Sequence, residues 1–207
     1  TWVSNKEKVS KELVKSGEDN LFPQYLISLY NKSSIHAAAV NAITEAVIGG
    51  GLTANNEAFL DKANKTGETW NDIFAKVSLD FYLHGSFALE IIWSLDRSRI
   101  AEVYHIDFST IRAREKNHRG HIPGYYIADE WKPFTRVTND DILYLPTFNE
   151  NTKQDEPSQI FVVRNYRPGQ QYYPLPLYNG ALKVITLDTE IDNFHVNNIK
   201  NGLAPSL

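Results

Sequence analysis

The 207-residue sequence contains neither cysteine nor methionine. Without cysteine the chain has no disulfide, no thiolate metal ligand and no cysteine nucleophile. Without methionine at position 1, Thr1 is not a translation start, so we expect a processed chain or a part of a longer protein. No apolar run approaches the roughly 18 residues of a membrane span, and the charged stretch 6–19 does not read as a secretory signal. The sequence therefore predicts no membrane association.

An excess of basic residues is absent as well. The chain has 21 Lys and Arg against 25 Asp and Glu, a formal net charge of −4 and an isoelectric point near 5.9. A protein that binds duplex DNA in general carries a basic footprint, which this composition excludes. Hydrophobic residues make up 42% of the chain and aromatic residues 12%. This is enough apolar material for a folded core and argues against intrinsic disorder.

The first part of the chain has helical periodicity. Apolar residues at helical spacing predict a short helix that begins near Pro23, a second that begins at Ser33 or Ser34 and stops at Gly49–Gly51, and a third that Thr69 caps and that ends at His84-Gly85. A weaker helix is expected over 56–65. Residues 1–20 are charged and carry few apolar side chains, which predicts a loosely held arm or a short helix.

The period then changes to that of strands. Alternating apolar residues over 87–93 and the stretch Ile100–Ile106 predict a β-hairpin. Short strands are expected near 110–114, 125–128, 141–146 and 160–163. Beyond the corner Pro174-Leu175-Pro176, the pattern predicts a long helix over 178–200 that Asn201-Gly202 closes. The order indicates an α+β fold: N-terminal helices, a small antiparallel β region and one long C-terminal helix. The expected parts are an arm (1–20), an α/β region (21–171) and the proline corner with the long helix (172–207).

No motif predicts chemistry. Gly49-Gly50-Gly51 follows a helix, whose C-terminus presents carbonyls rather than phosphate-binding N–H groups. His118 and His121 lie in a polar turn that fixes no shared ligand geometry, and His84 reads as a helix C-terminal residue favoured by the dipole. No Gly-x-Ser-x-Gly elbow and no dinucleotide fingerprint occurs. The sequence thus predicts no catalytic residue, no metal site and no cofactor.

Charged side chains offer two weaker signals. Arg112 and Arg114 alternate on a predicted strand and so share one side, which suits a phosphate or an acidic partner; a solvated hairpin tip is the alternative. Asp188 and Asp192 share a face of the last helix and could hold a divalent ion, although a solvated or subunit-facing acidic stripe is the simpler interpretation.

The long helix carries apolar residues on more than one face. They are Leu182, Val184, Ile185, Leu187, Ile191, Phe194 and Ile199. A helix that is apolar on more than one side is buried on more than one side. Packing against neighbouring subunits would bury the second side, and the surplus aromatic residues suit interfaces as well.

Taken together, these features resemble the N-terminal half of tailed-bacteriophage portal proteins. The resemblance consists of the helix Ser34–Gly51, the Trp70 helix, the segment His84-Gly85-Ser86-Phe87-Ala88-Leu89-Glu90 and the C-terminal stretch from Tyr172 to Pro205. That stretch is similar to the "Tyr-Gly-x-Pro" entry, long helix and "Asn-Gly-x-x-Pro" exit of lambdoid-type portals. Pro174 stands where that family often has glycine.

The resemblance implies a non-enzymatic subunit of a ring, usually a dodecamer, at one vertex of the capsid. Double-stranded viral DNA would pass through the ring, and the partners would be other copies of the chain, terminase, the major capsid protein and head–tail connector proteins. The location would be the virion, and the host cytoplasm during assembly. Residues 21–171 would form the wing and 178–200 a stem helix, and the remaining portal elements would follow Leu207. A mildly acidic chain suits a channel that lets DNA slide, because each neutralised phosphate adds affinity.

The resemblance to portal proteins implies functions for specific residues. Possible channel-facing or DNA-facing residues are Lys183 and Lys200, and a possible anionic-partner contact is Arg112 with Arg114. The expected oligomer interface comprises Tyr173, Pro174, Pro176, Tyr178, Leu187, Ile191 and Phe194.

Two other functions remain open from the residues themselves. The first is a binding module for carbohydrate or single-stranded nucleic acid, in which aromatic side chains stack on sugars or bases; the candidates are Trp131, Phe134, Tyr166, Tyr172 and Tyr173. The second is a nuclease or ATPase component of DNA packaging that uses Asp188 and Asp192 with a metal ion.

Overall fold

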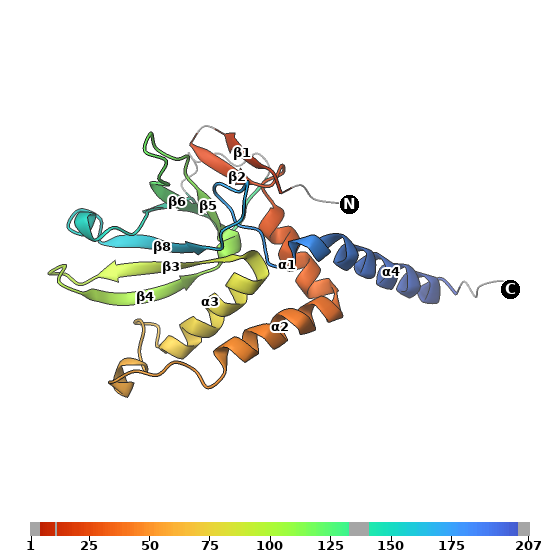
Figure 1. The fold of residues 1–207 in the computed structure, drawn as a ribbon, viewed down its shortest axis with the longest axis horizontal. Coiled ribbons are helices and arrows are strands. Elements are labelled where there is room, and N and C mark those ends of the chain that lie inside the picture. The colour runs from red at the N-terminus through yellow and green to blue at the C-terminus, as the bar shows by residue number, and fades with distance from the viewer. Residues whose placement is uncertain (1–4, 11, 133–140, 203–207) are drawn as a thin grey trace.

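The computed structural model describes residues 5–10, 12–132 and 141–202. Its helices are α1 (Phe22–Lys32), α2 (Ser34–Ile48), α3 (Trp70–His84) and α4 (Leu182–Lys200). Its strands are β1 (Glu7–Ser10), β2 (Leu13–Ser16), β3 (Ser86–Trp93), β4 (Ile100–Ile106), β5 (Ile111–Ala113), β6 (Gly124–Ile127), β7 (Leu143–Pro146) and β8 (Ser158–Arg164). This order confirms the predicted α+β class, with N-terminal helices, antiparallel sheets and a long C-terminal helix (Figure 1).

The strands form three antiparallel sheets, in the orders β1-β2, β5-β6-β7 and β4-β3-β8. Isolated bridges connect them: Leu13 pairs with Arg114, and Thr147 pairs with Ile160. The main hydrophobic cluster lies between the sheets and combines residues of β2, β3 and β5–β8 with two tyrosines of the proline corner. It comprises Val14, Ala88, Phe108, Ile111, Ala113, Ile122, Tyr125, Leu145, Ile160, Tyr172 and Tyr173. The corner before α4 is therefore part of the core.

The helices α2 and α3 begin and end at capping residues that can be recognised in the sequence. The Ser33 hydroxyl accepts a hydrogen bond from the N–H of His36 and caps α2. The Thr69 hydroxyl and the Asp72 carboxylate form a reciprocal capping box at the start of α3. These starts and the ends at Gly49 and Gly85 confirm the predicted boundaries. The hairpin β3–β4 and the short strands β5–β8 are confirmed as well, within a few residues.

Gly85 lies where three parts of the fold meet. It ends α3 with a left-handed backbone (φ 78°), and a Cβ added there would lie 2.6 Å from the carbonyl oxygen of Leu175. We expect Gly85→Ala to lower the free energy of unfolding by about 2 kcal/mol or more, since both the backbone and the contact are strained. Urea denaturation measures this change. Gly169→Ala is the control, because Gly169 has a similar φ of 80° and nothing within 4 Å of its added Cβ. Equal losses in both variants would contradict the steric part of the explanation.

Two sequence expectations are wrong. The described part of 1–20 is not a loose arm or a helix but the hairpin β1–β2, whose Leu13 and Val14 are 2% and 0% exposed. The predicted helix over 56–65 is only a single 3-10 turn, Glu57–Phe59. There the buried side chain of Asn64 holds a loop, since its Oδ1 accepts hydrogen bonds from the N–H groups of Thr66 and Glu68. An asparagine that bonds to nearby backbone competes with helix formation.

The long helix begins slightly later than predicted. A 3-10 turn, Asn179–Ala181, precedes it, and α4 then runs for 19 residues away from the body of the molecule (Figure 1). Among the described residues, α4 and the other helices all lack the length and apolarity that crossing a bilayer would require.

Candidate functional site

The base of α4 is fastened to α1 and α2. Leu182 is fully buried against Phe22, Leu26 and Leu29 of α1. Farther along, the Tyr25 hydroxyl lies 2.6 Å from the Thr186 hydroxyl, and the Ser33 hydroxyl donates to the Asp188 carboxylate at 2.9 Å. Beyond Thr189 every side chain of α4 is exposed except the half-buried Asn198. The helix is therefore anchored at one end and projects at the other.

A second apolar face lies opposite the docked one. At about 100° per residue, the docked positions 182, 185 and 189 face roughly away from positions 184, 187, 191 and 194. The latter four carry Val184, Leu187, Ile191 and Phe194, with exposed fractions of 68%, 59%, 47% and 62%. Their 3-4-3 spacing is that of a helix–helix seam. We call these four residues the α4 seam. No helix or strand in the part of the chain that the structure describes covers it. Three of its members, Leu187, Ile191 and Phe194, belong to the predicted interface.

The other predicted interface residues lie inside the chain. Tyr173, Pro174 and Pro176 are buried, and the Tyr173 hydroxyl donates to the carbonyl of Val14 and accepts from the N–H of Ala113 at 2.8 Å. Because they pack in their own core, these three offer no surface to a neighbouring subunit, which corrects the expectation. Tyr178 is half-buried, and its hydroxyl donates to the carbonyl of Leu83 at 2.8 Å.

His36 of α2 packs beside Tyr178, which lies just before α4. Its ring centroid lies 4.4 Å from that of Tyr178, and its Nε2 is buried without a hydrogen-bond partner among the described residues. Burial lowers the pKa of His36 below its usual value of 6.5, since the charged ring would lose hydration. The unfolded chain therefore takes up the proton first as the pH falls.

We expect the contribution of His36 to reduce stability as the pH falls below about 6.5. This contribution is constant above that pH and reaches its full unfavourable value below the folded-state pKa. His36→Phe keeps a ring beside Tyr178 and removes the titration, so its acid limb is expected to be flatter than that of the parent chain. Thermal unfolding from pH 8 to pH 5 measures the difference; parallel curves would contradict the assignment.

Arg112 is not a surface residue. It is 0% exposed, and all five of its N–H donors are used by neutral oxygens: the side chain and carbonyl of Asn20, the side chain of Gln24 and the carbonyls of Ser109 and Ile111. The expected contact with an anionic partner is wrong for Arg112, because no part of the guanidinium reaches the surface. Arg114 is partly exposed and pairs with the Glu12 carboxylate at 3.2 Å.

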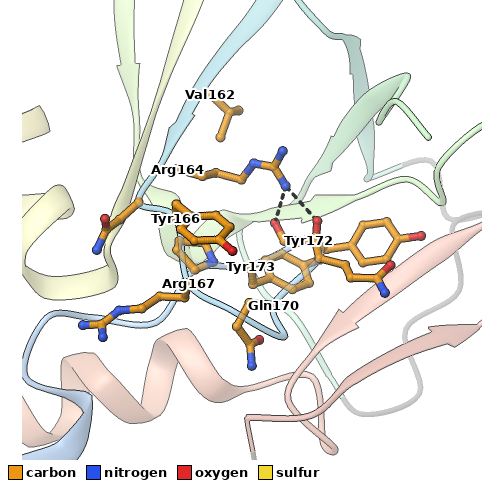
Figure 2. Close-up of a pocket in the computed structure, with 10 residues that line it drawn as sticks. Val162, Arg164, Tyr166, Arg167, Gln170, Tyr172 and Tyr173 are labelled. Atoms are coloured by element: carbon orange, nitrogen blue, oxygen red, sulfur yellow. Dashed lines mark hydrogen bonds between the residues drawn. The ribbon is translucent and has the colours of Figure 1, made fainter. Parts of the chain in front are cut away.

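A pocket of about 300 Å³ lies beside the proline corner (Figure 2). Arg164 crosses it and donates to the carbonyls of Gln171 and Tyr172, at 3.0 and 3.2 Å. Arg167 donates to the carbonyls of Pro176 and Leu177. Both guanidinium groups thus hold the loop in place, which favours a structural role for the pocket over anion binding.

The aromatic residues proposed as a stacking platform do not form one. Trp131, Tyr172 and Tyr173 are at most 9% exposed, and the Trp131 indole N–H donates to the carbonyl of Thr110 at 2.7 Å. Tyr166 is 83% exposed, and Phe134 lies outside the described residues. The buried rings are core residues, so the expected binding surface is wrong for these three.

The remaining candidates are dispersed. His118 and His121 are exposed in a turn, Asp192 is exposed, and Asp188 accepts a hydrogen bond from Ser33. Lys183 and Lys200 lie exposed on α4, and their channel-facing role stays a prediction. In the part of the chain that the structure describes, one group of potential metal ligands comes together: Asp80, His84 and Asp107. Sequence reasoning missed it, although the i, i+4 spacing of Asp80 and His84 on a predicted helix was visible.

Comparison with known proteins gives structural matches only. No family model matches the sequence, and no curated protein matches it. Among solved structures, a chain in the virion of a native gene transfer agent (GTA) particle superposes with a TM-score of 0.68 at 14% identity, covering 89% of this chain and 46% of that chain.

Two further matches come from particle necks. A chain in the neck of an empty GTA particle computed with C6 symmetry gives 0.66 at 14% identity, covering 89% of this chain and 48% of the other. A chain in the neck of a native GTA particle computed with C12 symmetry gives 0.61 at 12%, covering 98% and 49%. The chain therefore shares the fold of chains in these phage-like particles and spans about half of their length.

Proposed function

We propose that this chain is a structural subunit of a phage-type portal, the ring at a capsid vertex through which DNA is packaged and ejected. The observation that carries the proposal is the fold shared with chains of GTA particles, two of them in the neck. The C12 symmetry used for one of those necks agrees with a ring of twelve copies. In this role the chain is not an enzyme, and it belongs to the virion, or to the host cytoplasm during assembly.

The α4 seam supports self-association as the partner of this helix. Four apolar side chains at 3-4-3 spacing, between 47% and 68% exposed, form a continuous stripe along a helix that projects from the body (Figure 1). Water-exposed stripes of this kind are stabilised by packing against an apolar surface. In a ring, each copy of α4 is flanked by neighbouring copies, which supplies that surface.

The charge of the chain fits a passive channel. The net charge is −4, and Arg112, one of the two arginines expected to contact an anion, is buried and unavailable to phosphate. Few phosphates would then be neutralised, which keeps passing DNA weakly held. Lys183 and Lys200 are the proposed channel-facing cations of α4. Docking of terminase, major capsid protein and head–tail connectors belongs to the same proposal.

The test is the oligomeric state of the full-length protein. Size-exclusion chromatography with light scattering and negative-stain electron microscopy are expected to show closed rings of about twelve subunits. A monomer at all concentrations, with intact secondary structure by circular dichroism, would overturn the proposal.

A further inference from the structure

Three side chains at the junction of α3 with the sheets lie close enough to share one cation. Asp80 and His84 are one turn apart on α3, and Asp107 begins the turn that follows β4. One potential ligand atom of each lies within 4.8 Å of the others. Asp80 and His84 are 8% and 2% exposed, whereas Asp107 is exposed and gives the cluster access to solvent.

His84 is the residue that distinguishes this cluster from an ordinary acidic patch. Its Nδ1 is buried and has no hydrogen-bond partner among the described residues, and its ring meets that of Phe108 at a centroid distance of 5.6 Å. Buried polar nitrogens are nearly always partnered in native proteins, because leaving one unpaired is costly. A cation bound at Nδ1 would supply the missing partner.

The carboxylate of Asp80 is already oriented. Its Oδ2 lies 2.8 Å from Nε2 of His105 and accepts from the backbone N–H of Phe108 at 3.2 Å. Partners of this kind fix a ligating carboxylate in metal sites. Asp107 uses Oδ1 to accept from the N–H of Ser109 at 2.8 Å. Each aspartate thus has one oxygen held by the protein and a second one for an ion.

We propose that Asp80, His84 and Asp107 bind a divalent transition-metal ion of the zinc type. One imidazole nitrogen with two carboxylates suits such an ion, whereas Mg²⁺ and Ca²⁺ prefer oxygen ligands alone. Bond lengths of about 2.1 Å place ligand atoms roughly 3.4 Å apart. Ligand atoms that lie up to 4.8 Å apart would therefore have to approach one another by at most about 1.4 Å. The ion would tie the end of α3 to the connection between β4 and β5, a stabilising role independent of ring assembly.

The experiment uses tag-free protein in which the exposed turn histidines are removed by His118→Ala and His121→Ala. Titration calorimetry with Zn²⁺ and the thermal midpoint with and without Zn²⁺ are measured on this parent and on Asp107→Asn. Asparagine still accepts from the N–H of Ser109 but lacks the charge, so we expect at least tenfold weaker Zn²⁺ binding and a smaller Zn²⁺-dependent rise in the midpoint. Asp155→Asn, an exposed substitution outside the cluster, is the control and is expected to bind as the parent does.

A second measurement identifies the imidazole. Co²⁺ added to the parent is expected to give visible absorption bands that His84→Asn loses. If His84→Asn does not fold, Asp107→Asn still decides the matter, since its side chain is exposed. Zn²⁺ affinity that is unchanged in Asp107→Asn, or binding that is absent from the parent, would overturn the proposal.

Discussion

Ile191→Asp is expected to abolish assembly of the proposed ring and to leave the fold of the chain intact. Ile191 is 47% exposed at the middle of the α4 seam, so the charge costs little while the helix is free in water. In the packed seam the carboxylate would lose its hydration against apolar side chains, at about 3 kcal/mol per interface, or roughly a 100-fold weaker contact. Because every interface of a ring carries the substitution, the effect is repeated around it. Sedimentation velocity measures the loss of the ring, and circular dichroism measures the fold.

Asn193→Asp is the matched control for this variant. Asn193 is exposed two residues farther along the same helix and points away from the seam, so the same charge there should leave the rings intact. If Ile191→Asp unfolds the chain as much as it reduces assembly, or if both variants assemble normally, the seam is not the subunit interface.

Replacing Arg112 is expected to have the largest effect on stability. Arg112→Met removes a charge whose five N–H groups are all bonded. It leaves the carbonyl oxygen of Asn20 and Oε1 of Gln24 without a hydrogen-bond donor among the described residues, while Oδ1 of Asn20 keeps only the N–H of Ser16. Each buried acceptor that loses its donor costs about 1–3 kcal/mol, so we expect a total loss of about 3–5 kcal/mol. Burial lowers the pKa of Arg112 to about 10, so the group is still charged at neutral pH. Urea denaturation at pH 7 measures the loss.

Two further variants separate charge from geometry at this position. Arg112→Lys retains a charge but has three donors instead of five, so it is expected to recover only part of the stability. Arg114→Met removes a partly exposed arginine two residues away and is expected to cost less than about 1 kcal/mol. A loss below 1 kcal/mol for Arg112→Met would show that the network does not stabilise the fold.

Regular elements with strong local signals were predictable. The helix α2 follows from apolar spacing and its Ser33 cap, α3 from Thr69 and Gly85, and the hairpin β3–β4 from alternation. Their boundaries depend on neighbouring residues alone. By contrast, β1 and β2 are four residues each, and they are stabilised by burial of Leu13 and Val14 against strands about a hundred residues away. Such contacts have no local pattern.

Some features of the candidate site could also be predicted from local sequence, and others could not. The seam residues Leu187, Ile191 and Phe194 were predicted because helical spacing shows that α4 has a surplus apolar face. The burial of Arg112 and of Tyr173 could not be read from the chain, since their partners come from distant segments: residues 20 and 24 for the arginine, and Val14 for the tyrosine. Charge and aromaticity describe what a side chain can do, and the tertiary fold decides whether it faces water.

The side chain of Glu7 is expected to help the molecule resist a pulling force on α4. From β1, its carboxylate accepts the backbone N–H groups of Gln171, Tyr172 and Tyr173, at 3.1, 2.7 and 2.7 Å. These bonds fasten the first described strand to the segment that leads into α4. A pulling force along α4 would therefore have to shear three charge-assisted hydrogen bonds together before the corner could unravel. The three hydrogen bonds of Glu7 thus fix the base of the projecting helix α4 to the sheets.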